Sequence, residues 1–202
     1  LSLSMMAQDV QPSRLEKAKH EVESFINLLE GDRIGLVAFA GLAHMQCPLT
    51  LDYGAAKMFL DIMDPDLIPR PGTRLGLAIE KALEGFEAQE RKHKVLILIT
   101  DGEDHEGDAL EVAKEAERQG GVIYTVGIGS PRGEPIPVSG QTQRAEFKKN
   151  RDGEVVITKL DEVTLEKLAL QTGGTYYRAS TGEQELESIY ADIAGMEKKE
   201  LG

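Results

Sequence analysis

The chain has 202 residues, of which 41% are hydrophobic, and it carries a formal net charge of −12 and a single cysteine. This size and composition predict one domain with a full apolar core. The acidic balance argues against nucleic-acid binding, which needs a clustered basic surface, and one cysteine excludes an intrachain disulfide framework. No run approaches the ~18 consecutive apolar residues of a membrane-spanning helix, so no transmembrane segment is predicted.

The first half of the chain alternates between amphipathic and continuously apolar segments. Apolar residues recur at three- and four-residue steps over 12–30, which predicts a helix. Ser13 and Glu16 have the spacing of a capping box at its start, and Gly31 fits its end. The elements expected next are a strand over 33–39, a short edge strand over 44–50, a helix over 53–63 and a helix over about 73–86.

The second half contains the strongest strand signal, at 95–99, and one interruption of the alternation. Segments 145–149 and 154–158 flank an Asp152-Gly153 turn, which predicts a β-hairpin inserted at about 130–159. Before it we expect a helix from Asp108, which acts as its cap, to Gln119, and a strand over 122–128. After it we expect a helix over 163–171, a strand over 175–178 and a helix over 184–198. Thr181 and Gln184 have the spacing of a capping box for this last helix.

Strands that alternate with helices indicate a Rossmann-like α/β fold, in which a doubly wound, mostly parallel sheet has helices on both faces. Residues 1–202 contain no linker, repeat or low-complexity segment, so a single domain is predicted. In such folds a ligand binds outside the carboxyl ends of the strands. The polar residues of interest are therefore those that follow strands or begin helices.

Three polar clusters occupy such positions: Ser2 and Ser4 near the start, Thr73 at the opening of a helix, and Asp101 directly after the apolar strand at 95–99. Their hydroxyl and carboxylate oxygens suit a hard cation such as Mg²⁺, which takes about six oxygen ligands at roughly 2.1 Å and readily keeps waters. With one protein charge beside it, the cation would stay electrophilic. A carboxylate from another protein could then complete its coordination.

Each signal is ordinary when it is taken alone. Ser-x-Ser pairs are common in loops, Thr73 could simply cap a helix, and functional carboxylates after strands also occur in α/β enzymes and phosphoacceptor domains. Glu103 and Asp104 could shape the rim of a metal site or form a solvated acidic loop. The order, spacing and strand context of the three clusters together make the metal site the more specific interpretation.

These residues resemble the metal-ion-dependent adhesion site of von Willebrand factor A-type domains, which is built from Asp-x-Ser-x-Ser, a distant Thr and an Asp in a Thr-Asp-Gly turn. Ser2 and Ser4 match the serines, Thr73 the threonine and Asp101 the later aspartate. The segments 31–39, 47–50, 71–73 and 98–103 are similar to bacterial aerotolerance-type Bat proteins.

The resemblance implies a non-catalytic protein–protein interaction module that binds Mg²⁺, or Mn²⁺ or Ca²⁺, and through it a carboxylate of a partner protein. It further implies assembly with related proteins of the same family. It also implies a membrane-anchored bacterial protein whose domain lies on the periplasmic side.

The chain departs from the family pattern at its start. The leading Asp of the first motif would stand immediately before Leu1, and the first, central strand of the family's sheet would precede it. We therefore expect an N-terminally truncated chain with a weakened metal site, and an empty strand position that another segment or another chain would have to fill. A continuous sheet without such a replacement would contradict this expectation.

Two other functions compete with the interaction module. One is a Mg²⁺-dependent phosphotransferase or hydrolase that uses Asp101, although no general base or nucleophile can be nominated beside it. The other is a metal-independent scaffold that uses the hairpin at 130–159 as its contact surface.

Overall fold

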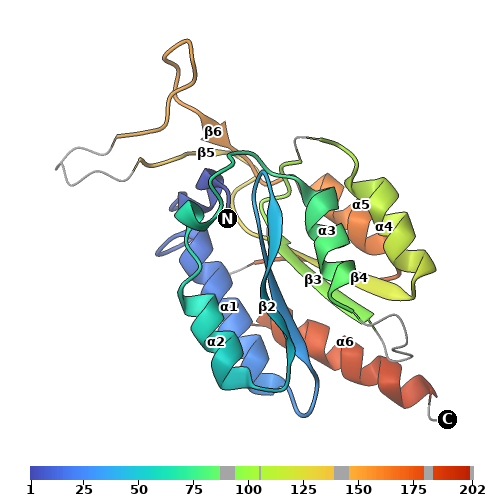
Figure 1. Ribbon diagram of the computed structural model, residues 1–202. Coiled ribbons are helices and arrows are strands. Elements are labelled where there is room, and N and C mark those ends of the chain that lie inside the picture. Colours follow the sequence, from blue (N-terminus) through green and yellow to red (C-terminus); the bar gives the residue numbers. More distant parts are fainter. Residues whose placement is uncertain (87–93, 105, 139–145, 180–183, 201–202) are drawn as a thin grey trace.

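The computed structural model describes residues 1–86, 94–104, 106–138, 146–179 and 184–200 (Figure 1). The elements, in chain order, are the 3₁₀ helix η1 (Leu3–Met6), α1 (Arg14–Leu28), β1 (Ile34–Phe39), β2 (Ala43–Thr50), α2 (Tyr53–Asp61), the 3₁₀ helix η2 (Pro65–Leu67), α3 (Leu75–Glu84), β3 (Lys94–Thr100), α4 (Ala109–Arg118), β4 (Gly121–Gly127), β5 (Glu134–Pro135), β6 (Ile157–Thr158), α5 (Glu162–Gln171), β7 (Tyr176–Arg178) and α6 (Gln184–Glu200). The predicted helices and strands therefore occur in the predicted order.

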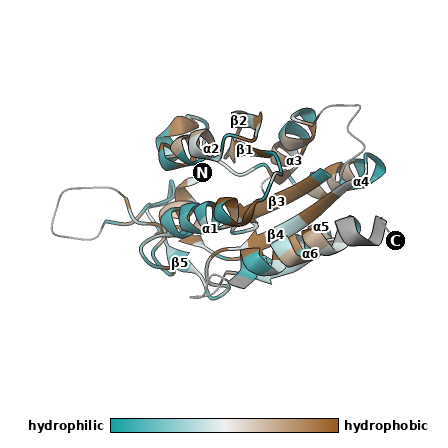
Figure 2. Ribbon diagram, turned by 90° about the horizontal axis from the view of Figure 1, so that it is seen from below, coloured by the Kyte–Doolittle hydropathy of each residue, from teal (hydrophilic) through white to brown (hydrophobic). Residues whose placement is uncertain are grey.

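The parallel sheet consists of β3, β4 and β7, in that order. Alternate residues of β3 point to opposite faces: Leu96 and Leu98 pack with α3, α4 and α5, whereas Ile97 packs with α1 and α6. Apolar strands thus lie between two layers of helices (Figure 2). This arrangement confirms the α/β fold with helices on both faces of a parallel sheet.

The sheet is interrupted between β1 and β3. Strand β1 pairs in antiparallel fashion with β2, and β3 pairs with β4, but among the described residues no strand lies between β1 and β3. An apolar cleft of about 400 Å³ occupies this position, and its lining includes Leu1, Val37, Ile97 and Ile99. The interruption agrees with the expectation of an empty strand position.

Local hydrogen bonds explain where several helices begin. Ser13 Oγ accepts a hydrogen bond from the Glu16 amide at 3.2 Å, which confirms the predicted cap of α1. Asp108 stands at the cap position of α4, but its side chain makes no capping bond, so this detail of the prediction is wrong. Its carboxylate instead packs directly against Gly76 of α3, where no side chain intervenes. The predicted cap at Thr181 lies outside the described residues.

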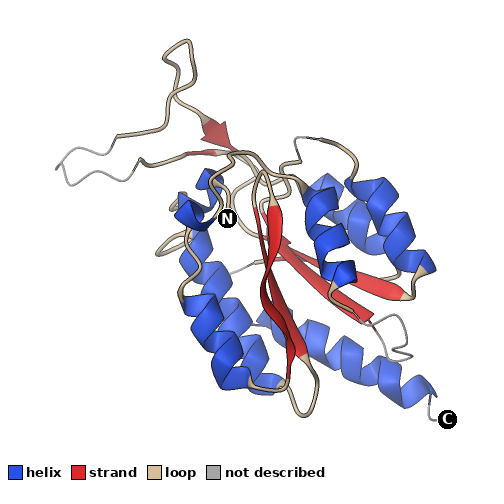
Figure 3. Cartoon of the chain, in the orientation of Figure 1, coloured by secondary structure: helices blue, strands red, loops and turns tan. Residues whose placement is uncertain are grey.

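Residues 130–138 and 146–159 form an arm that projects from the body of the molecule (Figure 3). At its base β5 pairs with β6, and farther out single antiparallel bridges join Pro137 to Phe147 and Lys149 to Val155. The chain reverses at the predicted turn, where Gly153 has a φ of 82°. Segment 134–138, for which no pairing was predicted, therefore contributes a third extended piece to the arm.

Candidate metal site

The candidate site begins where β3 ends. Asp101 follows Thr100, the last residue of the strand, and is completely buried. The turn is held by a hydrogen bond from the Gly102 amide to Thr100 Oγ1 at 3.2 Å and by one from the Asp161 amide to the Asp101 carbonyl at 2.8 Å. Gly102 has a φ of 79°, a conformation that favours glycine. The Thr-Asp-Gly sequence is thus suited to hold a carboxylate at this rim.

The two N-terminal serines are brought together by η1. Ser2 Oγ and Ser4 Oγ lie 2.7 Å apart, and Ser4 is buried. The Leu1 amino group donates to the carbonyl of Phe39 at the end of β1. Met5 of η1 packs in one apolar cluster with Ile99 of β3. The serines therefore lie near the carboxyl ends of β1 and β3.

Thr73 reaches the same rim from the start of α3 and is 2% exposed. The next residue, Arg74, donates its amide to the carbonyl of Ala40, just after β1, at 3.0 Å. The Leu75 amide, the first of α3, donates to Asp104 Oδ1 at 3.3 Å. The loop that follows β3 thus caps the helix that follows Thr73, and this contact places both predicted segments at one rim of the fold.

A buried arginine that the sequence analysis did not single out lies beside Asp101. Arg14 of α1 is fully buried and binds Asp9 through two nitrogens, at 2.9 and 2.7 Å. Its remaining terminal nitrogen, Nη1, donates to Asp101 Oδ2 and to Thr158 Oγ1, both at 3.1 Å. No pattern in the sequence could have identified this residue, because the contacts cross 87 and 144 positions of the chain.

The acidic side chains of the loop after Asp101 make hydrogen bonds within the protein. Glu103 Oε1 accepts from Thr158 Oγ1 at 2.9 Å and from the Lys159 amide at 3.0 Å, both at the base of the arm. Asp104, as described above, caps α3. Of the two alternatives for Glu103 and Asp104, the structure therefore favours the one in which they shape the rim. His105 lies outside the described residues.

The donor set fits a hard cation with few charged protein ligands. Ser2, Ser4 and Thr73 offer neutral hydroxyls and Asp101 offers a carboxylate, all of them oxygen donors. Asp101 Oδ2 accepts from Arg14 and Thr158, whereas Oδ1, as far as the described residues show, has a single contact, at 3.5 Å with Thr100 Oγ1. Oδ1 therefore retains most of its capacity to accept. Within the described ranges no group of three or more His, Cys, Asp and Glu side chains gathers as a metal cluster.

The fold and this rim define a class of protein: an α/β module with hydroxyl and carboxylate oxygens at the carboxyl ends of its strands. The von Willebrand factor type A domain model matches residues 1–103, about half of the chain. The chain belongs to this family.

Solved structures with high similarity come from two Bacteroides species. An aerotolerance-related membrane protein of Bacteroides fragilis is 40% identical, with a TM-score of 0.91 over 96% of this chain and 94% of that one. The protein BatB of Bacteroides thetaiotaomicron is 42% identical, with a TM-score of 0.92 over 98% and 95%. The predicted likeness to Bat proteins is therefore confirmed.

Longer relatives also match. A Mycobacterium marinum protein of the group UPF0353 is 29% identical over 96% of this chain and 57% of its own length. A Borreliella burgdorferi protein is 32% identical over 82% of this chain and 47% of its own length. The chain thus spans about half the length of these relatives. In the described part of the chain, no helix is both long and apolar enough to cross a membrane.

Proposed function

We propose that this domain is a non-catalytic interaction module that binds a divalent cation, Mg²⁺ above all, and through it a carboxylate of a partner protein. The observation that supports the proposal is the clustering of oxygen donors near the strand ends: the Ser2 and Ser4 hydroxyls pair, Asp101 directly follows β3, and Asp104 of the same loop binds the first amide of α3, just after Thr73. Four oxygen donors leave positions for water and for one external oxygen, since such a cation takes about six.

The residues have distinct roles in this proposal. Ser2, Ser4 and Thr73 would hold the cation as neutral ligands, and Asp101 would supply negative charge directly or through a water. The bound cation would supply a Lewis-acidic centre for the partner's carboxylate. Arg14 keeps the Asp101 side chain in place, since it binds Oδ2 and leaves Oδ1 available. A hydrolase would also need a nucleophile or base beside the cation, and the sequence nominates none.

The comparisons support this function at the level of the family. A mussel byssus protein, proximal thread matrix protein 1, with a TM-score of 0.63 and 18% identity, has been described with a zinc-occupied motif of this kind. The B. fragilis relative is described as a membrane protein. We therefore also propose that the domain works at a bacterial membrane, on the periplasmic side, where related proteins of the family are candidate partners.

Isothermal titration with Mg²⁺ and Mn²⁺ tests the cation site. Replacing Asp101 with Asn should weaken binding by about 10–100-fold, a typical effect of altering groups around a metal. Asp192→Asn is a matched control, because it removes the same charge from α6, where Asp192 meets Tyr177. Equal affinities in the Asp101 variant and the parent chain, or no detectable binding by the parent chain, would contradict the proposal.

A second measurement tests the carboxylate. With Mn²⁺ bound, acetate should displace a metal-bound water and lower the relaxation rate of the water protons, whereas acetamide, its neutral analogue, should not. The partner function requires this difference. An identical response to both molecules would restrict the site to cation binding alone.

A further inference from the structure

The base of the arm and the candidate metal site share one hydroxyl group. Thr158 of β6 is 1% exposed, and its Oγ1 lies 3.3 Å from Asp101 Oδ2 and 2.9 Å from Glu103 Oε1. It also accepts a hydrogen bond from Arg14 Nη1 at 3.1 Å. A threonine hydroxyl has a single proton. Thr158 can therefore donate to one of the two carboxylates at a time.

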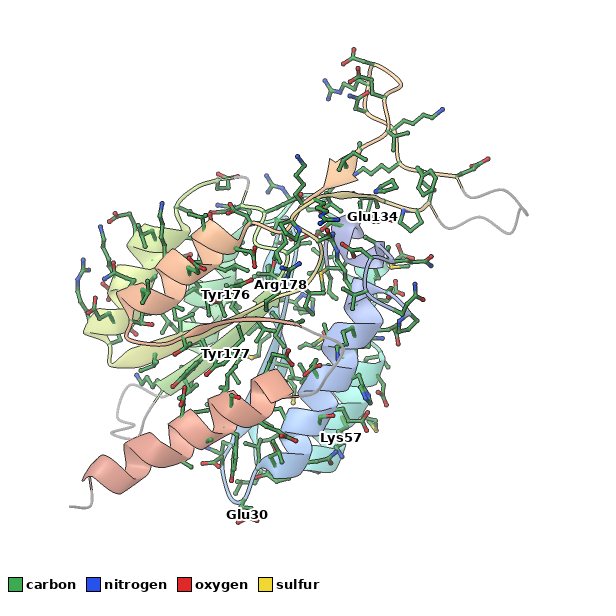
Figure 4. The ribbon with its side chains drawn as sticks, turned by 180° about the vertical axis from the view of Figure 1, so that it is seen from behind. Glu30, Lys57, Glu134, Tyr176, Tyr177 and Arg178 are labelled. Carbon is green, nitrogen blue, oxygen red and sulfur yellow. The ribbon has the colours of Figure 1, made fainter. Side chains whose placement is uncertain are left out.

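Glu103 extends this network into the backbone of the arm. The oxygen that accepts from Thr158 also accepts from the Lys159 amide at 3.0 Å. The neighbouring Leu160 amide donates to the carbonyl of Ser130 at 3.1 Å, and so joins the two ends of the arm. Side chains at the arm's base, such as Glu134, lie beside the body of the molecule (Figure 4). The pairing of Thr158 with Glu103 thus adds to the bonds that hold the base in place, beside the β5–β6 pairing and the bond between Leu160 and Ser130.

Arg14 fixes the other end of the network. Its bonds to Asp9 and Asp101 are made by a guanidinium that is shielded from water, and Asp9 Oδ2 also accepts from the Ser130 amide at 2.7 Å. Because Arg14 cannot lose its proton, it donates to Thr158 Oγ1 and leaves this hydroxyl's own proton for a carboxylate. The Thr158 proton therefore has two possible acceptors, Asp101 Oδ2 and Glu103 Oε1.

We propose that Thr158 is a positioning residue that couples Asp101 to the base of the arm. Thr158 Oγ1 already lies closer to Glu103 than to Asp101. When a cation draws on the charge of Asp101, this carboxylate becomes a still weaker acceptor, and the Thr158 proton stays on Glu103 for more of the time. The hydroxyl then holds Glu103 in the position in which it also binds the Lys159 amide. Occupation of the site stabilises the base of the arm. This coupling to a cation rests on the proposed function.

Hydrogen exchange of the backbone amides at 156–160, followed by mass spectrometry, tests the coupling. Saturating Mg²⁺ should slow exchange of the Lys159 amide several-fold in the parent chain. In Thr158→Val, which keeps the shape and removes the hydroxyl, this response should disappear while titration still detects bound Mg²⁺. Thr125→Val is the matched control, since Thr125 is equally buried and donates to the carbonyl of Leu165, away from the site.

A cycle of variants without metal separates this inference from the proposed function. Asp101→Asn removes the charge without any cation, so it should slow exchange at Lys159 when Thr158 is present and have no such effect in Thr158→Val. Equal effects of Asp101→Asn in both backgrounds would overturn the coupling, as would an unchanged response to Mg²⁺ in Thr158→Val. If Mg²⁺ does not bind at all, the proposed function fails, and the cycle still decides whether Thr158 links Asp101 to the arm.

Discussion

Replacement of Arg14 with Met tests how the buried charges of the rim are balanced. Met keeps the length and apolar bulk of the stem but removes the guanidinium that binds Asp9 and Asp101. Asp101 is completely buried and the Asp9 side chain is 6% exposed. Removal of one partner from a buried ion pair costs about 3–5 kcal/mol, because the remaining charge stays unpaired. We expect the free energy of unfolding to fall by about this amount.

Urea denaturation followed by circular dichroism measures this effect. Arg118→Met is the control, because Arg118 and Glu115 form an ion pair on the surface of α4 and the change should barely move the midpoint. Arg14→Met combined with Asp101→Asn should recover part of the loss, since it also removes a buried charge. If Arg14→Met unfolds at the same urea concentration as Arg118→Met, the buried guanidinium does not balance these carboxylates.

Three further changes test local features. Ser13→Ala should lower the free energy of unfolding by about 1 kcal/mol, since it removes the cap of α1; an unchanged urea midpoint would contradict the cap. Gly102→Ala should lower the free energy of unfolding by at least about 1–2 kcal/mol, since φ is 79° and a Cβ would lie 2.6 Å from the Asp161 carbonyl oxygen. Thermal unfolding measures this loss of stability. Burial raises the pKa of Asp9, but bonds from Arg14 and Ser130 outweigh this and hold the pKa below its usual value. The stability difference between the parent chain and Asp9→Asn should therefore be full above about pH 4 and vanish as the pH falls below it; a gap that persists in acid would refute this.

The sequence contains enough information for the order of elements. Its apolar periods predict α1, β3 and β4 closely, because these segments bury one helix face or both faces of a strand. The arm is harder to predict: segment 134–138 contains prolines and pairs through short bridges, so no period of two develops. In the part of the chain that the structure describes, β1 and β3 each pair on one side only. The residues of the two strands do not predict this, because it depends on which segment lies beside each strand in the folded protein.

The candidate site, too, is predictable from the sequence only in part. Ser2, Ser4, Thr73 and Asp101 stand after strands or at helix starts, so fold rules alone direct attention to them. Arg14 and Thr158 do not, because their significance arises from contacts with Asp101 that depend on tertiary structure. An arginine at the start of an amphipathic helix indicates a solvated charge by default, and its complete burial can be recognised only from coordinates.

The cleft and the candidate metal site belong to one structural feature. Leu1 lines the cleft together with Ile97 and Ile99 of β3, and its amino group donates to the carbonyl of Phe39 at the end of β1. A strand that lay in the cleft and ran parallel to β3 would border both β1 and β3, which among the described residues each pair on one side only. A carboxylate at its last position would add a charged oxygen to three hydroxyls and Asp101. The same extended segment would therefore complete the sheet and strengthen cation binding, because the strand would end at the rim where the candidate ligands lie.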